Sequence, residues 1–295
     1  MLILDFDGTA TDAEAEGVPF TKGYLQDIAE EVGWPLERVR YDYDRYMAEI
    51  LAEPHKYAWM MDGLAVAPAT VDPYLRIKPI ARKIIREAGI DITEAELQVL
   101  LTDTWYGKNY RLSGTSFRPG TLELLQRLYV TNGPAAIVTN SHTDAVLKKL
   151  KLLSMDLADQ TCSLTGSNFF AWWEDRVFGR AKKYIARDED SSMRLELPGL
   201  DRPVLCDRPH YLELLKQLAP KDGDGNPIWS EVTVVGDIFE LDGALPLSLG
   251  CRFGLLCNDM TPPYEVDFLC ASEDATVLES VEEILPFHRV GRSAA

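Results

Sequence analysis

Acidic and hydroxyl side chains follow three short apolar runs of the sequence, and together they could bind a metal ion and a phosphate group. Asp5 and Asp7 follow the first run, Thr139 follows the second and Asp237 follows the third. Carboxylate oxygens are ligands that Mg²⁺ prefers, and this ion commonly keeps water and substrate phosphate among its other ligands. Because alternate residues of an extended strand point to the same side, Asp5 and Asp7 can face one phosphoryl group. One carboxylate could attack phosphorus while the other transfers the proton of the leaving group.

The elements that must position these residues are buried strands that alternate with helices. Strands are predicted at residues 2–4, 135–138, 177–178, 203–206, 232–235 and 252–256. Such alternation favours an α/β fold, here a Rossmann-like doubly wound parallel sheet. Ligands of these sheets bind beyond the carboxyl ends of the strands, so the polar residues at three strand ends are expected to share one crevice.

The segment from about residue 20 to residue 115 shows helical patterns and no convincing strand. We therefore predict a helical block inserted after the first strand. The chain is expected to form two domains, because 295 residues exceed the usual size of one. The core would comprise residues 1–16 and 116–295, and the inserted, all-helical domain would comprise residues 17–115.

Helix ends within this inserted block can also be predicted. Thr21 is a suitable N-cap, and Gly33 stands where a helix would stop. Thr93 and Glu96 have the spacing of a capping box, in which each side chain pairs with the backbone of the other residue. Two separate helices are therefore expected to begin at Thr21 and Thr93.

Composition narrows the class of partner and the compartment. The formal net charge of −17 argues against nucleic acid as a partner, because nucleic acid favours basic surfaces. A metal ion and a few cationic side chains can still reverse the field within one cleft and admit a small anionic substrate. The chain shows no apolar stretch of transmembrane length and no signal peptide, so a cytoplasmic protein without a membrane partner is expected. Its five cysteines, Cys162 among them, lack C-x-x-C spacing and are expected to be reduced thiols.

Three sequence motifs resemble those of the haloacid dehalogenase-like (HAD) superfamily, in the order and spacing of that superfamily. Residues 2–9 match the first motif, an apolar strand followed by D-x-D-G-T. Residues 137–140 look like the second motif, an apolar strand ending in serine or threonine, and residues 234–242 are similar to the fourth, G-D-x-x-x-x-D. The resemblance covers nearly the whole chain. It implies a HAD-type phosphatase whose inserted helical segment is a type I cap domain.

The resemblance also implies roles for the residues that match the first two motifs. Asp5 would be the nucleophile that forms an aspartyl phosphate, and it would also be a Mg²⁺ ligand. Asp7 would protonate the leaving group and then activate the hydrolytic water, with its backbone carbonyl on the metal. Thr139 and the backbone of Asn140 would hold phosphoryl oxygens.

The third and fourth motifs complete the implied site. Asp237 would bind the metal, and Asp242 would support the metal site or orient the cation. The superfamily usually has a lysine, often before a proline, at the start of a helix upstream of the fourth motif. Arg208, which precedes a proline, occupies this place and is expected to neutralise the charges of carboxylate and phosphate, although its guanidinium is larger and forked. Lys182 and Lys183 are the rival candidates.

The expected function is the Mg²⁺-dependent hydrolysis of a small phosphorylated metabolite, a phosphate monoester, through a phosphorylated Asp5. A phosphomutase or another phosphotransferase would share the motifs and differ in the contacts of its cap, so this alternative stays open. A non-catalytic binding protein of the same fold is a second alternative, supported only by the unusual third motif. A dehalogenase would need no acid at the position of Asp7. No oligomeric state is predicted.

Overall fold

The computed structural model describes residues 1–158 and 167–290, and their contacts divide the chain into two compact units. The first unit contains both ends of the chain and a short internal segment, and the second contains the rest. Unit 1 comprises Met1–Thr11, Met60–Ala67 and Phe117–Ala295, and unit 2 comprises Asp12–Trp59 and Pro68–Ser116.

Unit 1 is built on a six-stranded parallel sheet with the order β10-β9-β8-β1-β4-β5. The strands are β1 (Leu2–Leu4), β4 (Ala135–Val138), β5 (Val177–Phe178), β8 (Thr233–Gly236), β9 (Arg252–Leu256) and β10 (Ala275–Leu278). Leu4 of β1 pairs with Ile137 of β4 on one side and with Val235 of β8 on the other. The carboxyl ends of these three strands therefore lie next to one another at the same edge of the sheet. The chain order reverses at β1, which is the kind of position where α/β sheets bind ligands.

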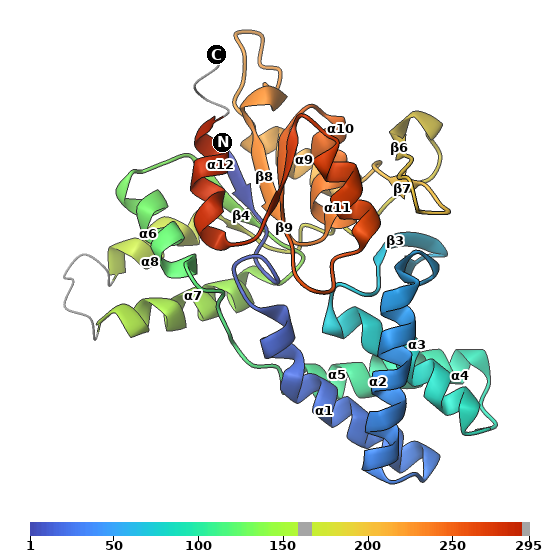
Figure 1. Ribbon diagram of the computed structural model, residues 1–295. Coiled ribbons are helices and arrows are strands. Elements are labelled where there is room, and N and C mark those ends of the chain that lie inside the picture. The colour runs from blue at the N-terminus through green and yellow to red at the C-terminus, as the bar shows by residue number, and fades with distance from the viewer. Residues whose placement is uncertain (159–166, 291–295) are drawn as a thin grey trace. The chain divides into compact units, whose positions relative to one another are not determined.

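Helices cover both faces of this sheet (Figure 1), which confirms the predicted α/β class. Alternate residues of β1 enter opposite cores, Ile3 on one face and Leu2 and Leu4 on the other. Each fully buried aliphatic side chain of this kind contributes about 1.5–3 kcal/mol. The core of Ile3 packs on α9 (Pro209–Leu218), α10 (Ala244–Ser248) and α11 (Pro263–Cys270). The other core packs on α6 (Thr121–Val130), α7 (Thr143–Ala158), α8 (Ser167–Glu174) and α12 (Ile284–Val290).

One predicted strand of unit 1 lies outside the central sheet. Strand β7 (Val204–Leu205) forms within the predicted run, but it pairs antiparallel with β6 (Arg194–Leu195) in a separate two-stranded sheet. The expectation that this run joins the parallel sheet is wrong, because a short apolar run does not reveal its pairing partner. Short helical turns complete the unit: η3 (Ser191–Met193), η4 (Trp229–Glu231), η5 (Phe239–Gly243) and η6 (Val281–Glu283).

Unit 2 is mainly helical and has a hydrophobic core of its own, which includes Phe20, Ile28, Ile80 and Ile84. Its elements are α1 (Ala13–Val32), α2 (Leu36–Ala52), η1 (Pro54–Lys56), α3 (Pro73–Glu87), α4 (Glu94–Val99), the π-helical η2 (Leu100–Tyr106) and α5 (Gly107–Tyr110).

Two of the predicted helix ends are confirmed and one is wrong. Thr93 and Glu96 form the capping box of α4, and Gly33 ends α1 with a φ of 66°. Helix α1 does not begin at Thr21. It begins at Ala13, because the side chain of Asp12 accepts a 3.0 Å hydrogen bond from the backbone N–H of Ala15 and caps the helix there.

The inserted segment is not all-helical. Strands β2 (Ala58–Met61) and β3 (Leu64–Pro68) form a two-stranded sheet. The turn between them, Asp62 and Gly63, has positive φ angles of 51° and 84°, as in the two-residue turns of hairpins. The prediction of no strand in this segment is therefore wrong at this hairpin.

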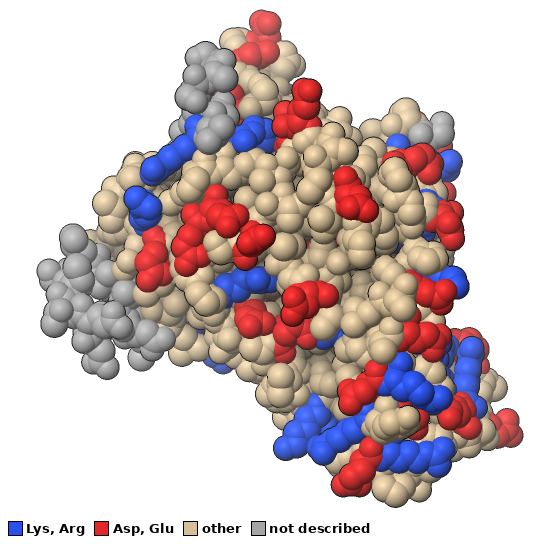
Figure 2. All heavy atoms as spheres, in the orientation of Figure 1, with Lys and Arg blue, Asp and Glu red and all other residues tan. Residues whose placement is uncertain are grey.

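The protein has charged side chains of both signs on its surface and several free thiols. Acidic and basic side chains are interspersed on the face that Figure 2 shows. Cys206, Cys251, Cys257 and Cys270 are free, and Cys162 lies outside the described residues. Within residues 1–158 and 167–290, no helix has both the length and the apolar character needed to cross a membrane.

Candidate active site

Asp5 lies at the carboxyl end of β1, in the centre of the sheet. Its backbone N–H donates a 2.8 Å hydrogen bond to the carbonyl of Val235, which continues the pairing of β1 with β8 beyond Leu4. Its side chain is buried, with a relative exposure of 7% for the residue. Asp5 is thus fixed at the point where the sheet reverses its order.

Asp237 approaches the backbone of Gly8 so closely that no other residue fits at position 8. A Cβ atom on Gly8 would lie 2.0 Å from Oδ2 of Asp237. Gly8 also has a φ of +86°, a conformation that side chains with a Cβ rarely adopt. The hydroxyl of Thr9 lies 3.4 Å from Oδ1 of Asp237. The D-x-D-G-T loop therefore packs directly on the carboxylate that follows β8.

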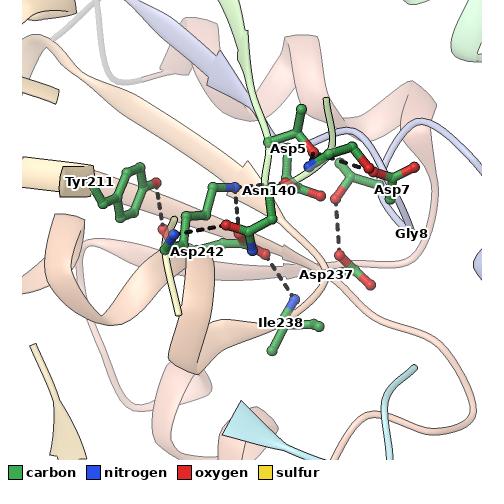
Figure 3. Close-up of polar contacts among 12 residues, drawn as sticks. Asp5, Asp7, Gly8, Asn140, Tyr211, Asp237, Ile238 and Asp242 are labelled. Atoms are coloured by element: carbon green, nitrogen blue, oxygen red, sulfur yellow. Dashed lines mark hydrogen bonds and ion pairs between the residues drawn. The ribbon is translucent and has the colours of Figure 1, made fainter. Parts of the chain in front are cut away.

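Asp242 enters the same place from the π-helical turn η5. Its Oδ2 accepts a 3.1 Å hydrogen bond from the backbone N–H of Ile238. Ligand oxygens of Asp5, Asp237 and Asp242 lie within 4.8 Å of one another, and all three residues are buried (Figure 3). Three carboxylates without cysteine or histidine form a donor set that suits a hard divalent cation such as Mg²⁺.

Lys183 supplies the positive charge of this site. Its Nζ donates hydrogen bonds of 2.7 Å to Oδ1 of Asp5 and of 2.7 Å to Oδ1 of Asp242. The residue is 1% exposed. The side chain of Asn140 positions the lysine, because its Oδ1 accepts a 2.8 Å hydrogen bond from the backbone N–H of Lys183. The loop after β5 is thereby tied to the turn after β4.

Both Asp5 and Lys183 have raised pKa values, for different reasons. Burial raises the pKa of Asp5 to about 8, and the charge of Lys183 offsets only part of this rise, since Asp242 also repels the ionised form of Asp5. Burial alone would lower the pKa of Lys183, but the charges of Asp242 and Asp5 raise it above its usual value. Lys183 therefore stays protonated. Asp5 shares this one cation with Asp242, so a second cation would favour its ionised form.

Asp7 lies beside the acidic cluster and has different partners. Its Oδ1 is 3.0 Å from Nζ of Lys149, and its Oδ2 accepts a 3.3 Å hydrogen bond from the hydroxyl of Thr139. The side chain of Asp7 is 34% exposed, so solvent reaches it. The structure thus brings Asp5, Asp7 and Thr139 together at neighbouring strand ends, as the sequence predicts.

Arg208 does not reach the carboxylates, contrary to the expectation from its place before a proline. Its guanidinium donates hydrogen bonds to three backbone carbonyls, those of Leu205, Lys183 and Val66. Burial lowers the pKa of Arg208 to about 10. The arginine begins α9, whereas the position against Asp5 is taken by Lys183. Lys183 follows β5 of the central sheet, which lies two strands from β1, whereas α9 follows β7 of the separate two-stranded sheet.

Two residues of this site were not assigned by sequence reasoning. Lys183 was only a rival to Arg208, although it follows strand β5, which was recognised as a short apolar run. No motif of the sequence points to Lys149. It lies three residues after the buried Val146 and therefore near the inner side of α7, and this periodicity is the available signal.

The architecture was compared with known proteins. No protein-family model matches the chain, and no curated protein sequence matches it significantly. A crystal structure of a predicted phosphoglycolate phosphatase from Haemophilus somnus matches with a TM-score of 0.52 at 15% identity, covering 97% of this chain and 96% of that one. The chain has the HAD fold. A HAD phosphatase from Thermococcus onnurineus gives a TM-score of 0.44 at 14% identity, with 97% of this chain and 95% of that chain covered.

Proposed function

We propose that the chain is a HAD-type phosphatase that hydrolyses a small phosphate monoester with the help of Mg²⁺. The observation that carries this proposal is the position of Lys183, which bridges Asp5 and Asp242 at the centre of an otherwise acidic cluster. A carboxylate repels a phosphate dianion, so a nucleophilic Asp5 needs nearby cations that offset this repulsion. The buried lysine is one of these cations.

The acidic cluster is suited to hold the metal. Asp5, Asp237 and Asp242 are the side chains that would bind or support it, and the backbone carbonyl of Asp7 is proposed as a further ligand. When bound, Mg²⁺ would neutralise charge between the nucleophile and the phosphoryl oxygens. The predicted phosphoglycolate phosphatase from Haemophilus somnus shares the fold, which supports this class of reaction.

The chain's own residues would carry out two steps. In the first, a carboxylate oxygen of Asp5 attacks phosphorus, the bond to the leaving oxygen breaks, and Asp7 gives its proton to that oxygen. In the second, Asp7 takes a proton from water, the water oxygen attacks phosphorus, and the bond between phosphorus and Asp5 breaks. The hydroxyl of Thr139 and the backbone N–H of Asn140 would hold phosphoryl oxygens in both steps. General acid–base catalysis of this kind contributes about 10²–10⁴-fold.

The inserted residues 17–115 are proposed to act as the cap, and residues 1–16 and 116–295 as the catalytic core. A cap would exclude bulk water and limit the size of the substrate. The hairpin of β2 and β3 departs from a purely helical cap, so the type of cap is part of the proposal.

Three measurements test the proposed function. A panel of phosphorylated metabolites would be screened with Mg²⁺ and after thorough chelation, and activity is expected only with the metal. Asp5→Asn should abolish turnover and retain the fold, as checked by circular dichroism. Beryllofluoride with Mg²⁺ should bind at Asp5 of the wild-type protein. Full activity after chelation, or a fluoride complex with Asp5 free, would contradict the mechanism.

A further inference from the structure

Lys149 lies beside Asp7, the proposed general acid, and the two proposed reaction steps do not use it. It extends from α7, the helix that follows the turn of Thr139. Its Nζ is 3.0 Å from Oδ1 of Asp7, and the same ammonium lies 5.7 Å from the centre of the Phe6 ring. The side chain of Lys149 is 20% exposed and that of Asp7 is 34% exposed, so the ion pair is partly shielded from water.

The helical periodicity of α7 explains why this lysine points inward. Val146 and Leu150 are buried in the core beneath the sheet. Lys149 is three residues after Val146 and therefore lies near the same side of the helix. Its neighbour Lys148 is exposed. The two adjacent lysines thus differ in environment although they share one helix.

Asp7 is held by two donors, and only one of them is compatible with a bound phosphoryl group. Thr139 donates its hydroxyl proton to Oδ2 of Asp7 at 3.3 Å. A hydroxyl has a single proton to donate. If this proton turns to a phosphoryl oxygen, as the proposed function requires, Oδ2 loses its partner. The contact between Lys149 and Asp7 can persist, because Lys149 contacts Oδ1 and not Oδ2.

We propose that Lys149 is the positioning residue of Asp7 during leaving-group protonation. This inference rests on the proposed function. When the proton of Asp7 moves to the leaving oxygen, Asp7 becomes a carboxylate next to an anionic phosphoryl group. Lys149 compensates the charge that develops on Asp7 and keeps its carboxyl group in place. Its contribution is therefore largest for leaving groups that need a proton.

The test compares leaving groups in the full-length protein. The value of kcat/KM would be measured with Mg²⁺ for p-nitrophenyl phosphate, whose leaving group departs without help, and for phenyl phosphate, whose leaving group benefits from a proton. The value of kcat/KM depends only on the steps up to and including the first irreversible one. It therefore reports on the step in which the leaving group departs. Lys149→Met should lower kcat/KM by about 10- to 100-fold for phenyl phosphate, within the range of general acid catalysis, and much less for p-nitrophenyl phosphate.

Further variants complete the design. Lys149→Arg retains the charge and should restore most of the activity toward phenyl phosphate, and Lys149→Gln should behave like Lys149→Met. Lys148→Met is the matched control and should act as the wild type on both compounds. Equal losses on both compounds, or no loss on either, would overturn the inference. If the wild-type protein hydrolyses neither compound nor any metabolite of the screening panel, the proposed function fails and the inference fails with it.

Discussion

Nζ of Lys183 lies 2.7 Å from Oδ1 of Asp5, and both side chains are buried at the centre of the sheet. The loop after β5 provides the lysine, and the end of β1 provides the aspartate. Lys183 also contacts Asp242, so two buried carboxylates share this one ammonium group. A divalent cation beside them would supply further positive charge.

Removal of the buried cation should abolish catalysis. Lys183→Met is expected to lower kcat by at least about 10²-fold, because electrostatic stabilisers in enclosed sites commonly contribute this much. The adjacent Lys182 is exposed, so Lys182→Met is the control and should retain turnover. Steady-state kinetics with Mg²⁺ would check both variants. Loss of activity in the Lys182 variant alone would assign the role to that residue instead.

A methyl group at position 8 should displace Asp237. Gly8 and Gly225 have nearly the same φ, +86° and +85°, but a Cβ on Gly225 would meet nothing within 4 Å. Both alanine variants incur the cost of placing a residue with a Cβ atom in a left-handed backbone conformation, about 1–2 kcal/mol. Only Gly8→Ala adds the clash with Asp237, so it should have the lower melting temperature of the two variants. It should also bind Mn²⁺ about 10- to 100-fold more weakly, which is the usual effect of removing a residue that supports a metal ligand. Equal effects of the two variants would contradict the close approach.

Arg208 should contribute to stability more than to chemistry. Arg208→Met removes three hydrogen bonds from a buried cation to backbone carbonyls, and each bond of this type contributes about 1.5–3 kcal/mol. We expect the free energy of unfolding to fall by roughly 3 kcal/mol or more. Arg194, exposed and paired with Asp188 at 2.7 Å, is the control, and Arg194→Met should cost less than about 1 kcal/mol. Urea denaturation would measure the difference, and similar values for both arginines would contradict this account.

The raised pKa of Asp5 should make stability and metal affinity depend on pH. With a pKa of about 8 in the folded protein and an ordinary value of 3.8, Asp5 holds its proton more tightly when folded. Its contribution to stability is therefore complete below about pH 4 and is lost as the pH rises toward 8, by at most about 1.4 kcal/mol per pH unit. Mg²⁺ competes with this proton, so the affinity for Mg²⁺ should increase with pH over the same range.

One comparison would isolate the contribution of Asp5 to stability from that of other groups. Melting temperatures of the chelated wild-type protein and of Asp5→Asn would be recorded from pH 5 to pH 9, a window of about two units around neutrality that spans most of the shift. The wild-type protein should lose stability relative to the variant as the pH rises. Identical pH profiles would show that Asp5 ionises normally in the folded chain.

The central sheet and the acidic cluster could be predicted because their signals are local. Each strand that carries a site residue is a short apolar run followed directly by Asp5, Thr139 or Asp237, and parallel pairing then aligns the strand ends. The helical insertion was also visible, but its hairpin was missed although Asp62 and Gly63 form the Asp-Gly pair typical of such a turn.

The other errors arose where tertiary contacts decide. Lys183 and Arg208 are both cations near strand ends, and no local pattern shows which of them turns toward Asp5. The start of α1 combines a local signal with tertiary packing, because Asp12 caps the helix and α3 packs against it. Gly17 and Pro19 disfavour a helix, yet α1 continues through both of them. A Cβ on Gly17 would lie 2.6 Å from Cγ of Pro73, so the glycine permits close packing of α1 on α3.

The central position of β1 has a consequence for biosynthesis. Leu2 pairs with Thr233 of β8, so β1 leaves the ribosome 231 residues before one of the two strands that flank it. At about 5–20 residues per second, this delay lasts roughly 10–50 s. Asp5 and Asp237 therefore cannot meet in a nascent chain, and the metal site should form only after most of the polypeptide has been translated. During this interval β1 has an unpaired edge, which makes the partly synthesised chain a candidate client for chaperones.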